Sequence, residues 1–213
     1  MPTIYDYHTE TGIIPESVEF GIEYNTQLST SSLTGYIQTI EIPGARWFCR
    51  MSYTNLEQDE ARSLSAFLAK LRGMSGRFYL PDYSRALPLG NASGIGSVVS
   101  TPTADSIEIS FSSGFLNIGD YIQIGNDESR ELKIITSRSF SGGSTFLYGI
   151  EPSLRWSLSS YDGFSVVTEL PRSVMMLAED NLASWSSRSK ISLSDFNIDC
   201  IEVIIPRNEV IAT

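Results

Sequence analysis

The chain has 213 residues, of which 41% are hydrophobic and 19% are charged, a composition that is ordinary for a globular protein. Its 25 acidic residues outnumber its 15 basic ones, which gives a net charge of −10. Binding to a phosphate backbone needs clustered positive charge, so this balance argues against specific nucleic-acid binding. A chain of this length buries roughly 70% of its unfolded surface, so one domain or two small ones are expected to be stable without disulfide bonds.

The two cysteines and the N-terminus point to assembly in a reducing compartment. Cys49 and Cys200 are far apart and lack the spacing of a disulfide framework or a zinc site. We therefore expect two buried free thiols in a chain made in the cytoplasm. The first fifteen residues lack the features of a signal peptide, and no run approaches the roughly 18 apolar residues of a membrane span. No stable membrane association is expected.

One segment, Leu56–Arg72, predicts an amphipathic helix. Asn55 is a suitable N-cap, and Gln58 three residues later resembles a capping box. The apolar side chains of the segment recur at helical spacing, and Gly73 can adopt the left-handed conformation that ends a helix. The expected buried face consists of Leu64, Phe67, Leu68 and Leu71.

Most of the remaining chain predicts short β-strands separated by Gly, Ser, Asn and Pro. The segment Arg46–Tyr53 alternates, and Lys190–Ile205 alternates with a change of phase at Ser194–Asp195 that indicates a turn or a bulge. The other predicted strands are short and rich in β-branched or aromatic residues: 77–80, 106–111, 120–125, 130–136, 145–150 and 164–168.

The order of these segments predicts two domains of a mainly β (α+β) class. Residues 89–104 are rich in Gly, Ser and Pro and predict a connector, and the strands that follow are sufficient for a small barrel, OB-like in size. We expect a β-sandwich-like belt domain with one packed helix, residues 1–88 with 170–213, and an inserted β-barrel-like domain, residues 89–169. One continuous sandwich is the competing interpretation.

The residues that support most enzyme mechanisms are missing or scattered. His8 is the only histidine and lies in a polar segment, where a solvated side chain is the simpler interpretation. The glycines of residues 90–97 have no following lysine or helix to hold a phosphate. Asp59 and Glu60 suit the first turn of the helix, and Asp127, Glu128 and Glu131 are expected in a solvated turn. No catalytic, metal-binding or cofactor-binding residues are predicted.

Two aromatic residues remain candidates for contact with a ligand or a partner. Trp156 and Tyr161 flank a serine-rich loop, and exposed aromatic rings are typical platforms for sugars. Aromatic residues in alternating strands are more often core or interface anchors. The pair therefore supports an alternative function, a carbohydrate- or fibre-binding module that acts through the inserted domain.

Several segments, in their order along the chain, resemble a family of phage tail-tip proteins. The similarity begins with SSLTGYIQT and PGARW, continues through the helix, and includes stretches in the insertion and near the C-terminus. The sequence departs from the family where Ile150-Glu151-Pro152 replaces a more usual Trp-Pro-Pro, and the first 25 residues match nothing in it. The matching stretches lie at residues 31–39, 43–47, 66–68, 71–73, 76–82, 116–125, 131–135, 150–155 and 196–202.

The chain is thus similar to distal tail, or minor tail, proteins of long non-contractile-tailed bacteriophages. The resemblance implies a structural protein that assembles with itself as a ring, commonly a hexamer, at the virion tail tip after synthesis in the bacterial cytoplasm. It implies the tail tube protein and the tail hub and tape measure proteins as partners, and no catalytic or cofactor residues. DNA would pass through the ring unbound, so we expect carboxylates to line the channel and repel the phosphates.

The sequence therefore leaves three functional hypotheses. The leading hypothesis is a structural ring that joins the tail tube to the hub and receptor-binding apparatus. The carbohydrate- or fibre-binding module is second and is compatible with the first. An enzyme acting on a cell-wall polymer is third, because the sequence lacks an assembled catalytic set.

Overall fold

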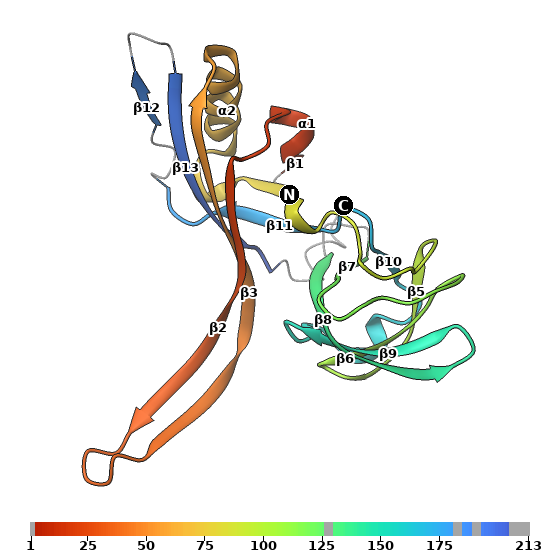
Figure 1. Cartoon of the computed structure of the whole chain (residues 1–213). Coiled ribbons are helices and arrows are strands. Elements are labelled where there is room, and N and C mark those ends of the chain that lie inside the picture. The colour runs from red at the N-terminus through yellow and green to blue at the C-terminus, as the bar shows by residue number, and fades with distance from the viewer. Residues whose placement is uncertain (1–2, 126–129, 181–184, 189–192, 205–213) are drawn as a thin grey trace.

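The computed structural model describes residues 3–125, 130–180, 185–188 and 193–204, and it is mainly β, as expected. These residues contain two α-helices and thirteen strands. The strands form a curved sheet and a closed barrel (Figure 1). The helices are α1 (Tyr7–Thr11) and α2 (Gln58–Leu71). The strands are β1 (Ile4–Asp6), β2 (Ser17–Thr30), β3 (Ile37–Leu56), β4 (Arg77–Pro81), β5 (Gly96–Thr103), β6 (Ser106–Ser110), β7 (Tyr121–Ile124), β8 (Glu131–Gly142), β9 (Thr145–Glu151), β10 (Ser165–Val167), β11 (Arg172–Leu177), β12 (Trp185–Arg188) and β13 (Leu193–Glu202).

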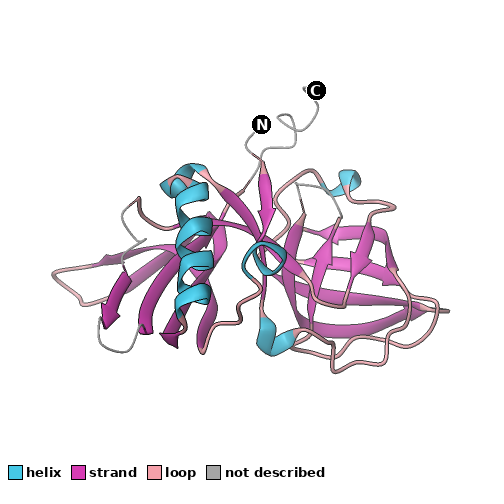
Figure 2. Ribbon diagram, turned by 90° about the horizontal axis from the view of Figure 1, so that it is seen from above, coloured by secondary structure: helices cyan, strands magenta, loops and turns pink. Residues whose placement is uncertain are grey.

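The first and last parts of the chain form one seven-stranded sheet. Its order is β1-β4-β11-β13-β3-β2, and β12 pairs with β13 beyond that path. The helices cover one face of the sheet (Figure 2). In the described residues this region is therefore one sheet with helices packed on it, rather than the two facing sheets of the expected sandwich.

Helix α2 forms for the reasons that its sequence suggests, although it begins later than predicted. The four predicted core residues are buried against the sheet, which confirms the amphipathic face. The predicted N-cap is wrong: β3 continues to Leu56, and Asn55 donates its backbone N–H to Asp195 Oδ1. Glu57 is the N-cap instead, and its N–H donates to Glu60 Oε2. Arg72, followed by Gly73, takes the positive φ that ends the helix.

The middle of the chain forms a closed barrel of six strands in the order β10-β5-β6-β9-β8-β7. Every neighbouring pair is antiparallel, so that the barrel has one strand more than an OB fold. Its interior is a hydrophobic cluster separate from that of the sheet. All barrel strands lie between Gly96 and Val167, and the sheet strands come before and after them; the boundaries at residues 88 and 170 stay predictions.

Some sequence-based expectations about the strands are wrong or incomplete. The predicted connector, residues 89–104, includes β5, where Gly96 lies so close to Phe111 that a Cβ atom would meet its ring at 2.6 Å. Strands β1, β2, β11 and β12 were not predicted, and β3 begins nine residues earlier than expected. The predicted irregularity in β13 is confirmed by a register shift between Ser194 and Phe196.

The predicted alternation of residues 46–53 is also confirmed. Trp47, Cys49, Met51 and Tyr53 are each at most 2% exposed and belong to the hydrophobic core of the sheet. Cys49 and Cys200 lie directly opposite each other on β3 and β13, and both are buried free thiols. Burial raises the pKa of Cys49 to about 12, so this thiol stays protonated at neutral pH.

Candidate functional site

The most unusual feature of the molecule is a long β-hairpin that leaves the sheet. Strands β2 and β3 pair from Ser17–Ser52 near the core to Thr30–Ile37 at the far end. The neighbouring strand β13 pairs with β3 only between Phe48 and Leu56. Residues 24–42, which we name the arm, therefore form a ribbon whose strands pair only with each other among the described residues, and it points away from both halves of the molecule (Figure 1).

A register shift marks the point where the arm begins. Glu23 pairs with Arg46 and Asn25 pairs with Ile42, so residues 43–45 have no partner on β2. Gly44 within this bulge has a φ of 127°, which other residues rarely adopt. A bulge of this kind bends a strand and increases its twist, which changes the direction of the arm relative to the sheet.

The surface of the arm is nearly free of charge and exposes several large apolar side chains among polar ones. All of its residues are exposed, and Glu41 is the only charged residue among them. Ile40 and Ile42 share one face of the ribbon, because they pair with Gln27 and Asn25. Of the exposed large hydrophobic side chains in the described part of the chain, seven lie here: Tyr24, Leu28, Leu33, Tyr36, Ile37, Ile40 and Ile42.

A ribbon with these properties is suited to binding another polypeptide. An isolated two-stranded hairpin is marginally stable in water, and soluble proteins usually protect free strand edges with lysines, prolines or a covering segment. Residues 24–40 contain no lysine and no proline. Their free backbone groups and exposed apolar side chains can instead be covered by adding the arm to a neighbouring molecule.

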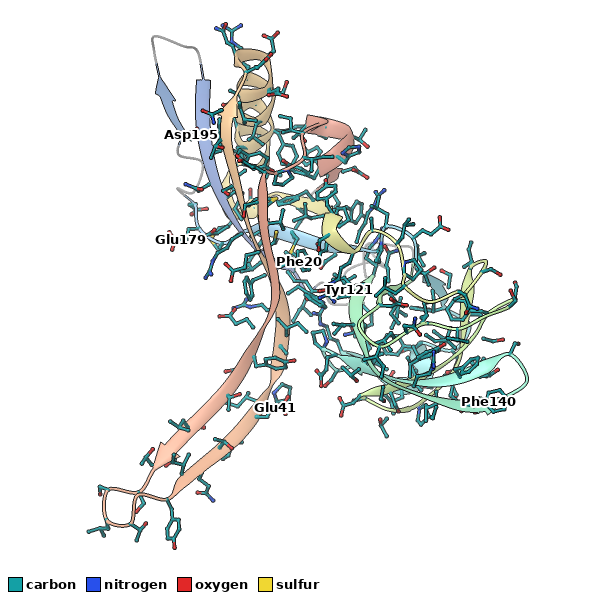
Figure 3. All side chains as sticks on the ribbon, viewed as in Figure 1. Phe20, Glu41, Tyr121, Phe140, Glu179 and Asp195 are labelled. Carbon is teal, nitrogen blue, oxygen red and sulfur yellow. The ribbon has the colours of Figure 1, made fainter. Side chains whose placement is uncertain are left out.

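The second notable feature is the junction between the barrel and the sheet, where Trp47 links the two. Its ring nitrogen donates to the carbonyl of Leu132 at 2.8 Å, and its backbone N–H donates to Glu202 Oε2 at 3.0 Å. The ring lies 5.1 Å from that of Tyr121 and 5.3 Å from that of Phe20, and Figure 3 shows the latter two residues on the two sides of the junction. The hydrophobic core of the sheet thus includes residues of the barrel wall.

Charged side chains are buried beside this contact. Lys133 Nζ lies 2.6 Å from Glu131 Oε2, with both side chains fully buried, and donates to the carbonyl of Ser153 at 2.9 Å. Arg155 of the barrel segment pairs with Glu202 of β13. Two positive and two negative side chains therefore form a network of no net charge. Burial lowers the pKa of Lys133, and Glu131 opposes this effect.

Of the two predicted contact residues, Tyr161 places its side chain in this network, whereas Trp156 is partly buried and reaches the network through its backbone N–H. Their rings are 5.7 Å apart, but Tyr161 is 0% exposed. Its hydroxyl donates to Glu131 Oε1 and accepts the backbone N–H groups of Arg155 and Trp156. The expectation that Tyr161 is an exposed platform is wrong, because its ring packs with the barrel core.

The other polar candidate residues that the structure describes lie on helices and strands of the fold. His8 is exposed on α1, and Asp59 and Glu60 lie in the first turn of α2, as predicted. Asp127 and Glu128 lie outside the described residues. Glu131 was predicted in a solvated turn, and this is wrong: it begins β8 and is 0% exposed.

Within the described ranges, no three His, Cys, Asp or Glu residues are grouped so that they could hold a metal ion. Neither α1 nor α2 has the length and the apolar character that a membrane-crossing helix needs. The sequence matches no protein-family model and no curated protein.

Proposed function

We propose that this protein is a non-enzymatic structural component of a phage tail tip, a distal tail protein that forms a ring between the tail tube and the hub. The observation that carries the proposal is the exposed, nearly uncharged arm, whose strand edges need a neighbour to pair with. A head-to-tail contact, in which one surface binds a different surface of the next copy, generates a ring when the rotation closes. The resemblance to tail-tip proteins suggests six copies.

The network at the junction supports a structural role as well. Because Trp47, Arg155 and Glu202 join the barrel to the sheet, the two parts keep a defined relative orientation. A ring subunit needs such rigidity if its inserted barrel is to hold the hub or the receptor-binding apparatus at a fixed position relative to the ring. The alternative function, a carbohydrate- or fibre-binding module, has lost one of its two proposed anchors, since Tyr161 is buried.

The face of the sheet opposite the helices suits a channel for DNA. It carries Glu19 and Asp199, which lie on either side of Arg50, and the pair Glu23–Arg46. Figure 3 shows Glu179 and Asp195 on the side away from α2. On the part of this face formed by β2, β3 and β13, the carboxylates just named outnumber the guanidinium groups among the described side chains. We propose that this part lines the lumen, where negative charge keeps the phosphates from adhering.

The oligomeric mass of the purified protein tests the proposal. We expect a concentration-dependent hexamer by size-exclusion chromatography with light scattering. Ile40→Lys places a charge on the arm and should leave a folded monomer, whereas the matched Ile118→Lys, on a barrel loop with similar exposure (66% against 58%), should keep the hexamer. A wild-type protein that is monomeric at all concentrations would contradict the ring. Equal assembly of the two variants would contradict the role of the arm. A ring whose lumen is neutral or basic by electron cryomicroscopy would contradict the acidic channel.

A further inference from the structure

A groove of about 650 Å³ lies where the arm leaves the sheet, between the base of the arm and the barrel. This volume is within the range, roughly 300–1,000 Å³, that is typical of binding clefts. The wall contributed by the arm consists of Glu41, Pro43, Gly44 and Ala45. The barrel side and the end of the sheet contribute Ala104, Asp105, Pro152, Ser153, Leu154, Arg155 and Ile204.

The walls of this groove, the arm groove, combine apolar side chains with carboxylates and with Arg155, whose charge is balanced by its ion pair with Glu202. Glu41 and Asp105 are exposed at its sides. Partial burial raises the pKa of the nearby Glu151, and Asp105 and Glu41 raise it further, which indicates that the three carboxyl groups lie within electrostatic reach of one another. The groove therefore offers several hydrogen-bond acceptors in a small space and disfavours an acidic ligand.

The arm groove also exposes a piece of strand with unused pairing capacity. Residues 43–45 have no partner on β2, and β13 does not extend beyond Phe48 along β3. Apart from Pro43, which has no N–H, their backbone groups are thus free among the described elements to form hydrogen bonds with an added segment. A suitable ligand is an uncharged polypeptide segment that carries hydroxyl donors and one or two apolar side chains.

We infer that the arm groove binds the tip of the arm of a second copy of this chain, an inference that rests on the proposed ring. The tip, residues 29–37, has the required chemistry: it contains no charged residue and six hydroxyl side chains. Leu33 and Tyr36 are 96% and 78% exposed and can pack on the apolar part of the groove. Two copies of a chain with a net charge of −10 repel each other, and an uncharged tip approaches a carboxylate-lined groove at low electrostatic cost.

The tip must come from another copy. Within one molecule the arm is a paired ribbon that points away from its own groove (Figure 1), so that its tip cannot turn back without breaking the strand pairing. Each copy has one tip and one groove on the same hairpin. The contact is therefore head-to-tail, as a ring requires.

Disulfide cross-linking between two differently tagged copies tests the inference. One copy carries Leu33→Cys and the other carries Ala104→Cys, at exposed positions of the tip and the groove. The native cysteines are buried and provide no competing exposed thiol. After mild oxidation of a ring mixed from equal amounts of the two variants, about one junction in four joins a Leu33→Cys tip to an Ala104→Cys groove, so we expect up to about half of the subunits in linked pairs that contain both tags. The yield should fall to less than about a tenth of that when Ala104→Cys is replaced by the barrel-loop control Ile118→Cys.

A second pair of variants measures the contribution of the groove without a cross-link. Asp105→Arg replaces an acceptor in the groove, and we expect it to raise the concentration needed for assembly at least tenfold. Asp162→Arg makes the same change in charge at an exposed barrel position outside the groove and should not weaken assembly. The inference fails if wild-type rings form but the tip cross-links equally well to the control, or if Asp105→Arg assembles normally. In either case the proposed ring itself stands. A wild-type protein that never assembles overturns both.

Discussion

Lys133 and Glu131 are fully buried, yet each has a partner that makes its charge tolerable. Alternation along β8 places them on the side of Ile135, which belongs to the barrel core, whereas Leu132 packs with Trp47 in the core of the sheet. Both faces of this short segment are thus buried. A local sequence pattern cannot predict this, because a Glu-Leu-Lys run normally indicates a strand with one wet face.

We therefore predict a large destabilisation when only one member of the pair is removed. Lys133→Met leaves Glu131 buried without its cation and should lower the free energy of unfolding by about 3–5 kcal/mol. Adding Glu131→Gln should recover most of that loss. Urea denaturation measures both changes, and Lys70→Met, at a half-exposed pair with Glu10, should cost less than about 1 kcal/mol. A loss in Lys133→Met no larger than in this control would contradict the assignment of a buried charge pair.

At the level of single elements, side-chain periodicity correctly predicts which residues are buried. The buried face of α2 and the alternation of residues 46–53 follow from side-chain spacing alone. The composition of segment 89–104 predicts a loop, because glycine and serine usually indicate loops, whereas here Gly96 allows β5 to pass close to Phe111. The part of this segment before β5 is held by backbone hydrogen bonds to residues 113–115 and by the carboxylate of Asp120.

Asp120 accepts three backbone hydrogen bonds, from Leu89 at 2.7 Å, Gly90 at 3.0 Å and Asn117 at 2.8 Å. Asp120→Ala removes the two oxygens that accept these three hydrogen bonds, at a site that is 4% exposed, and we expect it to lower the free energy of unfolding by roughly 1.5–3 kcal/mol. Thermal and urea unfolding of the variant measure this effect. The exposed Asp162→Ala is the control, and an equally small change in both variants would show that the connector is held by other contacts.

For the whole molecule, composition and strand signals predicted a mainly β chain with an inserted barrel. They did not predict the arm. Its strands have the alternation of an ordinary hairpin, and the feature that distinguishes it is the lack of a neighbouring strand, which depends on where β13 ends. The buried position of Tyr161 was missed for a related reason, since burial at a junction is set by contacts between distant parts of the chain.

The arm and the core are made of the same two strands, and this has a consequence for the free subunit. The half of each strand inside the sheet is held by packing, so that it acts as a template for the register of the half outside. Amide hydrogen exchange should accordingly be slow near Met51, faster at Arg46, and fastest at Ile40, all along β3. Mass spectrometry of the monomeric Ile40→Lys protein, compared with the ring, measures this gradient. Uniform protection along β3 in the monomer would mean that the outer half is stable by itself; a gradient that vanishes on assembly would mean that neighbours complete each other's folding.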